Sequence, residues 1–245
     1  MMELNGKTAV VTGGAVRVGR ALVLALAEAG CNVFIHYGRS AGPAIQTQEE
    51  AKTFGVKAAI HSANLAEAEG ALRVMETAVS TFGHIDILIN SAAIFPDEDS
   101  FTHTDLALWD KLMNINLRAP FLLSRAFAAQ LPTDQPGKII NILDARLRRP
   151  ATDHFVYRFT KGSLWQMTEM LALELAPRIT VNGVALGAIL PPPGKDASYL
   201  DKIAQNRIPL RRAGSAAIVA ENVLHLLRQD FLTGVIVPID GGEFL

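Results

Sequence analysis

Residues 7–19 read KTAVVTGGAVRVG, so that an apolar run leads directly into a glycine-rich turn. The run Lys7–Thr12 is typical of a buried strand, and the residues from Arg17 onward have the length and apolar spacing of a helix. Glycines permit a tight turn and a close approach of the backbone to a pyrophosphate, which the N-terminus of the next helix attracts. This unit predicts a dinucleotide site; a turn that packs without a ligand is the alternative. The expected contacts are Gly13, Arg17, Val18 and Gly19.

Short apolar runs alternate with longer helical stretches along the rest of the chain. The runs are nearly continuous in Val, Ile and Leu, which is typical of strands that helices cover on both faces. We therefore predict an α/β doubly wound (Rossmann) fold, with a parallel sheet of about seven strands, in a single domain of residues 1–245. The expected strands are Lys7–Thr12, Asn32–Tyr37, Val56–His61, Ile85–Asn90, Lys138–Leu143, Ile179–Val184 and Gly234–Pro238. The expected helices are Arg17–Ala29, Leu65–Phe82, Leu117–Gln130, Phe155–Ala176 and Ser215–Gln229.

Composition excludes several classes of protein. The 245 residues include 23 Lys+Arg and 24 Asp+Glu, so no broad cationic field favours a nucleic acid as partner. Hydrophobic residues make up 49% of the chain, which is ample for a large core. The single cysteine, Cys31, is expected to be a small buried hydrophobe, and the six histidines lack the spacing of a metal site. The first residues lack a signal-peptide pattern and no stretch is apolar enough to span a membrane, so we expect a soluble cytoplasmic protein.

The most irregular stretch runs from Gly187 to Arg212 and contains three consecutive prolines at 191–193. It follows a predicted strand, so it lies at the carboxyl edge of the sheet, where ligands bind in this class of fold. A long loop in a compact domain is usually functional or disordered. We expect a substrate lid at about 187–212; an ordinary surface loop is the alternative.

The end of the second predicted strand distinguishes between the two nicotinamide cofactors. An NAD site places Asp or Glu there to bind the ribose hydroxyls. Residues 36–40 instead read His36-Tyr37-Gly38-Arg39-Ser40, and the next acidic residue is Glu49. A guanidinium holds a 2′-phosphate bidentately and a hydroxyl adds a donor. NADPH is therefore the expected cofactor; the alternative is that Arg39 is only a solvated loop charge.

Tyr157 and Lys161 lie four residues apart at the start of a predicted helix, so their side chains share one face. A phenol has an ordinary pKa of about 10, and a neighbouring ammonium favours its ionised form. Such a pair can deliver a proton to a substrate while a nicotinamide delivers hydride. The spacing alone is common by chance, but here it follows a glycine-rich turn and the predicted strand Lys138–Leu143.

Over essentially its whole length the chain resembles the short-chain dehydrogenase/reductase superfamily. The resemblance rests on the Thr12–Gly19 turn, Asn90-Ser91-Ala92-Ala93, Asn116 in Asn114-Ile115-Asn116, the Tyr157/Lys161 pair and the closing Pro238-Ile239-Asp240-Gly241-Gly242. It implies that Tyr157 is the proton donor and that Lys161 binds the nicotinamide ribose and tunes the phenol. Asn116 would hold a water that links Lys161 to solvent. Further implied cofactor contacts are Tyr157 itself and His36, Tyr37, Arg39, Ser40, Asn64, Leu65, Asn90, Ala92, Gly187 and Ile189.

Several departures from the general pattern resemble the pteridine reductase branch. Asp144 stands thirteen residues before Tyr157, where the superfamily normally has Ser, and Arg17 replaces a glycine of the turn. The sequence at 36–40 also matches that branch, and Phe95 matches the aromatic that stacks on the pterin. The resemblance implies a substrate site of Arg17, Phe95, Asp144 and Tyr157. The chain also departs from the pattern at four positions, namely Asn64 for Asp, Ser91 for Asn, Ala93 for Ser and Leu186 for Pro, so the resemblance specifies a substrate class and not one substrate.

The chemistry of Asp144 leads to the same substrate class. A Ser hydroxyl donates to a carbonyl oxygen as negative charge builds there, whereas a carboxylate repels that oxygen. A carboxylate instead suits a substrate with N–H donors, such as an aminopterin; a protonated carboxyl could itself assist proton transfer. A neutral change in a weakened carbonyl reductase is the alternative. For Phe95 the alternative is a core role, and for Arg17 a pyrophosphate clamp. The basic run 146–149 is expected to be a solvated loop face; contact with an acidic tail of the substrate, such as a glutamate, is the alternative.

We therefore expect an NADPH-dependent reductase of pterins or dihydropterins. The enzymatic alternative is a carbonyl reductase of 3-oxoacyl thioesters or small ketones, and a non-catalytic NADPH sensor is the alternative from another class. The expected helices Leu117–Gln130 and Phe155–Ala176 are apolar on more than one face, and such helices form dimers within tetramers in the superfamily. A homotetramer is therefore expected.

Overall fold

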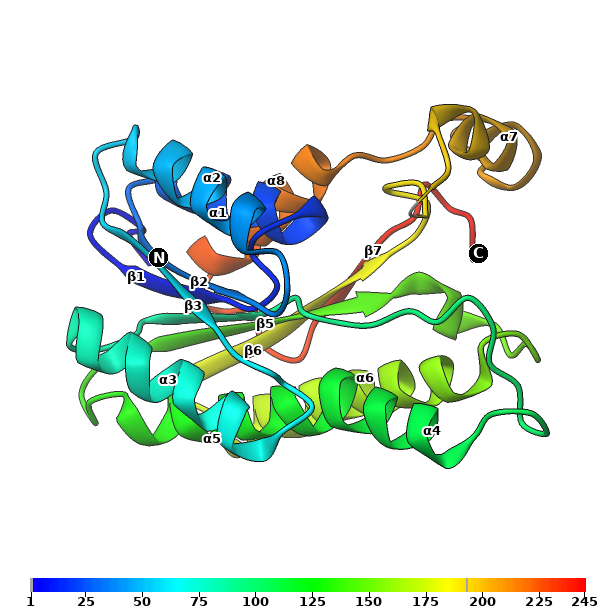
Figure 1. The fold of residues 1–245 in the computed structure, drawn as a ribbon. Helices are drawn as coiled ribbons and strands as arrows, with labels where there is room; N and C mark the ends of the chain where they lie inside the picture. The colour runs from blue at the N-terminus through cyan, green and yellow to red at the C-terminus, as the bar shows by residue number, and fades with distance from the viewer. Residues whose placement is uncertain (1, 193) are drawn as a thin grey trace.

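The computed structural model describes residues 2–192 and 194–245, and in these residues seven parallel strands form one sheet (Figure 1). The strand order is β3-β2-β1-β4-β5-β6-β7, so the direction of winding reverses between β1 and β4. A reversal of this kind opens a ligand crevice beyond the carboxyl ends of the two strands. The strands are β1 (Thr8–Val11), β2 (Asn32–Tyr37), β3 (Ala58–Ser62), β4 (Ile87–Asn90), β5 (Gly137–Asp144), β6 (Ile179–Leu186) and β7 (Ile236–Ile239).

Helices cover both faces of the sheet. Figure 1 shows α1, α2 and α8 on one face and α3 to α6 on the other, while α7 lies beyond the sheet beside the C-terminal segment. The helices are α1 (Arg17–Glu28), α2 (Ala41–Lys52), α3 (Ala68–Phe82), α4 (Leu106–Met113), α5 (Ala119–Gln130), α6 (Phe155–Glu174), α7 (Ala197–Arg207) and α8 (Ala216–Arg228). A π-helical turn, η1 (Asn114–Arg118), joins α4 to α5, and a 3₁₀ turn, η2 (Ala145–Arg148), follows β5.

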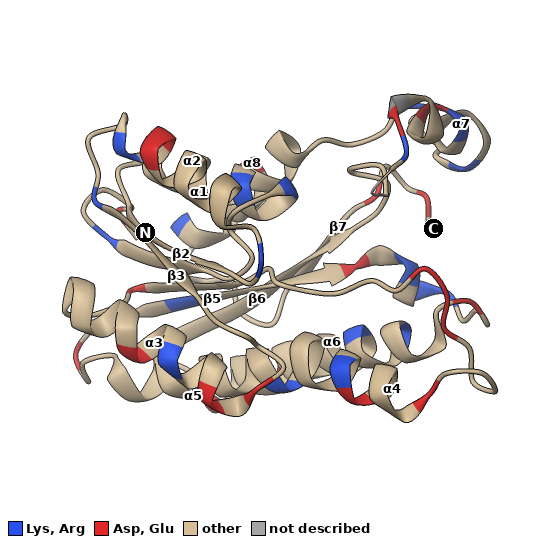
Figure 2. Cartoon of the chain, viewed as in Figure 1, with Lys and Arg blue, Asp and Glu red and all other residues tan. Residues whose placement is uncertain are grey.

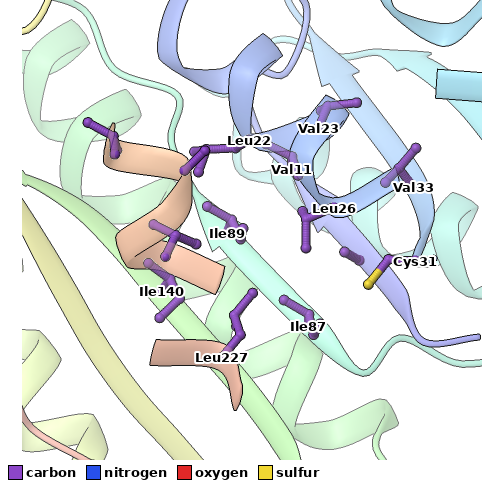
Figure 3. Packing of buried hydrophobic residues seen from close by; sticks show 14 of the residues in the cluster. Val11, Leu22, Val23, Leu26, Cys31, Val33, Ile87, Ile89, Ile140 and Leu227 are labelled. Atoms are coloured by element: carbon purple, nitrogen blue, oxygen red, sulfur yellow. The ribbon is translucent and has the colours of Figure 1, made fainter. Parts of the chain in front are cut away.

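The two faces bury separate apolar clusters. In the first, Leu22 and Leu26 of α1 and Leu227 of α8 pack over the strand residues Ile89 and Ile140 (Figure 3). Each of these side chains is at most 2% exposed, and full burial of such a residue contributes about 1.5–3 kcal/mol. The strand ends that carry the predicted site are therefore held on a close-packed core.

The predicted fold class is confirmed, and each of the seven expected strands is present with small shifts at its ends. Three helices were missed: α2, α4 and α7. The expectation of an irregular segment at 187–212 is therefore wrong in part, because α7 lies inside it. The expected helix Leu65–Phe82 also begins later, at Ala68, because residues 64–67 form a turn in which Glu67 N–H donates to the Asn64 carbonyl.

Two absences hold for the described residues. They contain no helix that is long and apolar enough to cross a membrane. They also bring together no group of three or more His, Cys, Asp or Glu side chains that could hold a metal ion.

Candidate active site

The glycine-rich turn lies between β1 and α1, and its glycine positions leave no room for a side chain. Gly13 has a φ of +66°, and a Cβ at Gly19 would lie 2.1 Å from the Gly13 carbonyl oxygen. A Cβ at Gly13 would lie 3.0 Å from the Cα of Ala92, so the turn after β1 touches the segment after β4. No side chain caps the N-terminus of α1. The first amides of α1 are therefore available to an anion, as a pyrophosphate site requires.

His36 supports this turn from inside. The Gly13 N–H donates to His36 Nδ1 at 3.2 Å, and His36 Nε2 therefore carries the proton that it donates to the Ala63 carbonyl at 3.1 Å. Burial lowers the pKa of His36 from 6.5 to about 4, so the ring is neutral near pH 7. The His36 ring thus shapes the turn, while Arg39, which is exposed, and Ser40, which precedes α2, follow the end of β2.

His36 makes the stability of the protein sensitive to acid. As the pH falls below 6.5 the unfolded chain takes up a proton at His36, whereas the folded chain does so only near pH 4. The unfolded state thus binds more protons in this window, and the unfolding free energy falls by about 3 kcal/mol from pH 6.5 to 4 because of this residue. We expect His36→Asn, which keeps an acceptor for Gly13, to remove this part of the pH dependence in urea unfolding. The exposed His225→Asn should leave it intact.

Most other expected cofactor residues are present at the crevice, but several of their side chains bond within the protein. Asn64 donates to Glu67 and accepts from the Ala66 N–H. Asn90 donates to Asn141 Oδ1 at 2.8 Å. These hydrogen bonds leave the backbone and the remaining lone pairs of Asn64 and Asn90 for any further contact. The rest are placed as follows: Val18 in the first turn of α1, Tyr37 at the end of β2, Leu65 buried before α3, Gly187 against Asp240, and Ile189 buried in the core.

Arg17 joins the turn to the expected lid. It is exposed, has a φ of +55°, and its Nη2 donates to the Pro191 carbonyl oxygen at 2.9 Å. Pro191 belongs to the irregular segment that follows β6. The same guanidinium is thus placed between the glycine turn and the segment 187–212.

Tyr157 and Asp144 meet at the carboxyl end of β5. The Tyr157 hydroxyl donates to Asp144 Oδ2 at 3.0 Å, and both side chains are buried. Burial raises the pKa of the Tyr157 phenol well above 10, and the Asp144 carboxylate raises it further. Burial and the Asp144 carboxylate therefore outweigh the lowering of this pKa that was expected from Lys161. The phenol keeps its proton at neutral pH, which is the form that a proton donor needs.

Lys161 lies one turn further along α6. Its ammonium donates to the Ile142 carbonyl at 2.8 Å, and burial lowers its pKa to about 8, while the Asp144 carboxylate opposes that shift. Asn116 lies in the π turn, where its amide donates to the Ile94 carbonyl at 3.0 Å and its oxygen accepts from the Ile94 N–H at 2.9 Å. The Asn116 side chain is thus engaged within the protein, and the expected water contact stays a prediction.

Phe95 borders the same pair. Its ring lies edge-on to that of Tyr157, with 4.7 Å between centroids, and 46% of the residue is exposed. Arg146 lies 5.1 Å above the ring centroid of Phe95, and its Nε donates to Asp144 at 3.0 Å. Arg146 therefore borders the Tyr157–Asp144 pair, which corrects the expectation of a solvated loop face for this residue, while Arg148 and Arg149 are exposed as expected. The expectation of a substrate-facing Phe95 is compatible with this exposure.

Three features surround one crevice of the parallel sheet: the glycine turn, the Tyr157/Lys161 pair and Asn116 in the π turn. A family model described as "Enoyl-(Acyl carrier protein) reductase" matches residues 14–243. The chain belongs to the short-chain dehydrogenase/reductase superfamily.

Individual members of the superfamily are similar over almost the full length. The 3-oxoacyl-[acyl-carrier-protein] reductase FabG of Aquifex aeolicus is 34% identical and covers 99% of each chain. Among solved structures, FolM alternative dihydrofolate reductase 1 from Brucella suis, in complex with NADP, has a TM-score of 0.93 and 32% identity, covering 99% of this chain and 96% of that one. A short chain dehydrogenase from Burkholderia cenocepacia, in complex with NADP, has a TM-score of 0.92 and 30% identity, covering 100% of both chains.

Sequence reasoning missed two further residues of this short-chain dehydrogenase/reductase site. The buried Asp99 carboxylate accepts the Val156 N–H at 2.6 Å and the Tyr157 N–H at 3.3 Å, and so caps the start of α6. The His154 ring lies 4.3 Å from that of Phe95. Neither residue carries a local signal, because both act through contacts that only the folded loops create.

Proposed function

We propose that this chain is an NADPH-dependent reductase of pterins or dihydropterins. Its class is an NADP-dependent oxidoreductase, in keeping with its superfamily and with the NADP held by similar structures. The substrate class rests on one observation, the 3.0 Å hydrogen bond from the Tyr157 hydroxyl to the Asp144 carboxylate. Asp144 occupies the place where the superfamily pattern has a Ser, so the site presents an acceptor where a carbonyl reductase presents a donor.

The residues present fit NADPH. The uncapped N-terminus of α1 can receive the pyrophosphate, and exposed Arg39 with Ser40 can receive the 2′-phosphate. No acidic residue stands between Gly38 and Glu49 to repel that phosphate. Bound NADPH supplies the hydride.

The proton comes from the chain. Tyr157 holds a proton because burial and Asp144 raise its pKa, and its hydroxyl can pass that proton to a ring nitrogen. Asp144 accepts from the Arg146 N–H at 2.9 Å and from Arg146 Nε at 3.0 Å as well as from Tyr157. In every one of these contacts the carboxylate acts as an acceptor, and an amino or ring N–H group of a pterin is a matching donor. Phe95 offers a partly exposed ring on which a flat heterocycle can stack.

A second candidate is reduction of 3-oxoacyl thioesters or small ketones. It is favoured by the similarity to FabG of Aquifex aeolicus over 99% of both chains. The acceptor character of Asp144 opposes it, because negative charge that develops on a carbonyl oxygen needs a donor. A non-catalytic NADPH sensor is a more remote candidate, since a sensor needs neither Tyr157 nor Lys161.

NADPH oxidation measured side by side with 7,8-dihydrobiopterin, 7,8-dihydrofolate and an acetoacetyl thioester tests the proposal. We expect turnover of at least one dihydropterin at a kcat/KM at least tenfold above that of the thioester. Turnover of the thioester alone would make the carbonyl reductase the correct assignment. Tight NADPH binding without turnover of any of the three would favour the sensor.

The proposal includes a single domain with a substrate lid at 187–212, a cytoplasmic location and a homotetramer. Large apolar side chains on the outer surfaces of α5 and α6 support an assembly, since exposed apolar patches mark protein interfaces. They are Phe121, Phe159, Met170 and Leu173, which are 45–84% exposed. The mass of the protein in solution tests this part.

A further inference from the structure

A charged cavity of about 450 Å³ lies beside the candidate active site, between η2, the start of α6, the end of α7 and the C-terminal segment. Figure 2 shows charged segments of both signs gathered in this region, beyond the carboxyl ends of the strands and below α7. Its volume is within the range of small-molecule sites. Its charged lining residues are Arg146, Arg149, Arg158, Arg207, Asp153 and Glu243.

Positive charge exceeds negative charge in this lining. Both carboxylates are already paired: Asp153 accepts from Arg158 Nη2 at 2.9 Å, and Glu243 lies 2.9 Å from Arg207 Nη2. Arg158 also donates to the Arg146 and Arg149 carbonyls, so it holds the loop after η2 in place. In the part of the chain that the structure describes, no hydrogen bond or ion pair engages the exposed guanidinium of Arg149.

Arg146 connects this cavity to the ring-binding site. The same side chain lines the cavity, lies over Phe95 and donates to Asp144. A planar substrate that stacks on Phe95 would therefore have one edge at the cavity. A substituent that leaves the ring on that side would enter a space lined by arginines.

We propose that this cavity binds an anionic tail of the substrate, with Arg149 as its free cation. The substrate is then a dihydropterin that carries a carboxylate-bearing extension, as the benzoyl-glutamate of dihydrofolate does, and not a dihydropterin with a short neutral side chain. A guanidinium suits a carboxylate because the two groups can bond through two parallel N–H···O contacts. This inference rests on the proposed pterin reduction.

Steady-state kinetics with two substrates that share the ring and differ in the tail test the inference. We expect Arg149→Gln to raise KM for 7,8-dihydrofolate about fivefold, as for a partly exposed charge pair, and to leave kcat unchanged. The charge reversal Arg149→Glu should raise that KM at least twentyfold. For 7,8-dihydrobiopterin both variants should keep the wild-type kcat and KM. Added KCl should raise KM for dihydrofolate only, because salt screens the tail contact.

Arg148→Gln is the matched control. Arg148 lies in the same turn and has the same charge, but it does not line the cavity, so its removal should not change KM for either substrate. Unchanged dihydrofolate kinetics in both Arg149 variants, or wild-type reduction of dihydrobiopterin but not of dihydrofolate, would overturn the anionic-tail site and leave pterin reduction standing. Failure of the wild type to reduce either compound would instead reject the proposed function, and this inference with it.

Discussion

Replacing Tyr157 with phenylalanine is expected to lower kcat for dihydropterin reduction by about a thousandfold, because a positioned general acid contributes roughly 10²–10⁴ in rate. The hydroxyl is the group that faces Asp144 at 3.0 Å, and its raised pKa keeps it protonated at neutral pH. The ring itself remains, so the edge contact with Phe95 is kept. Stopped-flow or steady-state NADPH oxidation measures the loss.

NADPH binding separates a chemical role from a structural one. The sites expected for pyrophosphate and 2′-phosphate, at Gly13 and Arg39, lie on β1–α1 and after β2 and do not depend on the phenol. The Kd for NADPH, read from nicotinamide fluorescence, should therefore stay within about twofold of wild type. A Tyr157→Phe variant with more than a tenth of the wild-type kcat would show that another group donates the proton.

The sheet could be predicted from the sequence because its strands are covered on both faces. β5 shows this most clearly: each of its eight residues is buried, and four of them are Ile or Leu, which gives the strand its apolar signal. The one-to-two-residue shifts at strand ends arise because ladder hydrogen bonds, and not apolar character, set where a strand stops.

The missed helices are either weakly amphipathic or short. α2 has Gly42 and Pro43 in its first turn and buries only Ala44, Thr47 and Ala51. α4 has eight residues, of which Leu112 is buried. In α7 the sequence is mostly polar and the side chains that it does bury are few, so tertiary context decides that it is helical. Periodicity is weak in α2 and α7, and α4 is too short to show it over a full window, so a prediction that relies on periodicity misses all three.

The candidate site was likewise predicted from the sequence only in part. The thirteen-residue spacing between Asp144 and Tyr157 places one at the end of β5 and the other at the start of α6, and the structure joins them. Arg146 was misjudged because a run of arginines has no informative period. Only the 3₁₀ turn η2 brings its Nε back to Asp144 and over Phe95. Asp99 caps α6 from 57 residues away, and no local pattern reveals such a contact.

The choice of substrate is expected to change with one side chain, in Asp144→Ser. This variant should lower kcat/KM for the dihydropterin about a hundredfold, because hydrogen bonds to a charged group contribute roughly 1.5–3 kcal/mol each and Ser cannot accept from Tyr157, Arg146 and a substrate N–H together. It should also raise kcat/KM for an acetoacetyl thioester, because a hydroxyl donor now faces the carbonyl oxygen. NADPH oxidation with both substrates measures the ratio of the two values.

Asp134→Ala is the control variant, because it removes a carboxylate close to strand β5 but away from the site. Asp134 is exposed and precedes the opposite end of the same strand, so its loss should change neither rate. Asp144→Asn should lie between wild type and Asp144→Ser for the dihydropterin, since an amide keeps one accepting oxygen and loses the charge. Equal dihydropterin rates in wild type and both Asp144 variants would mean that the carboxylate only anchors Arg146. In that event the hydrogen bond from Tyr157 to Asp144 would have no part in the selection of the substrate. The Asp144 carboxylate at the end of β5 could then not be the feature that distinguishes this site from that of a carbonyl reductase.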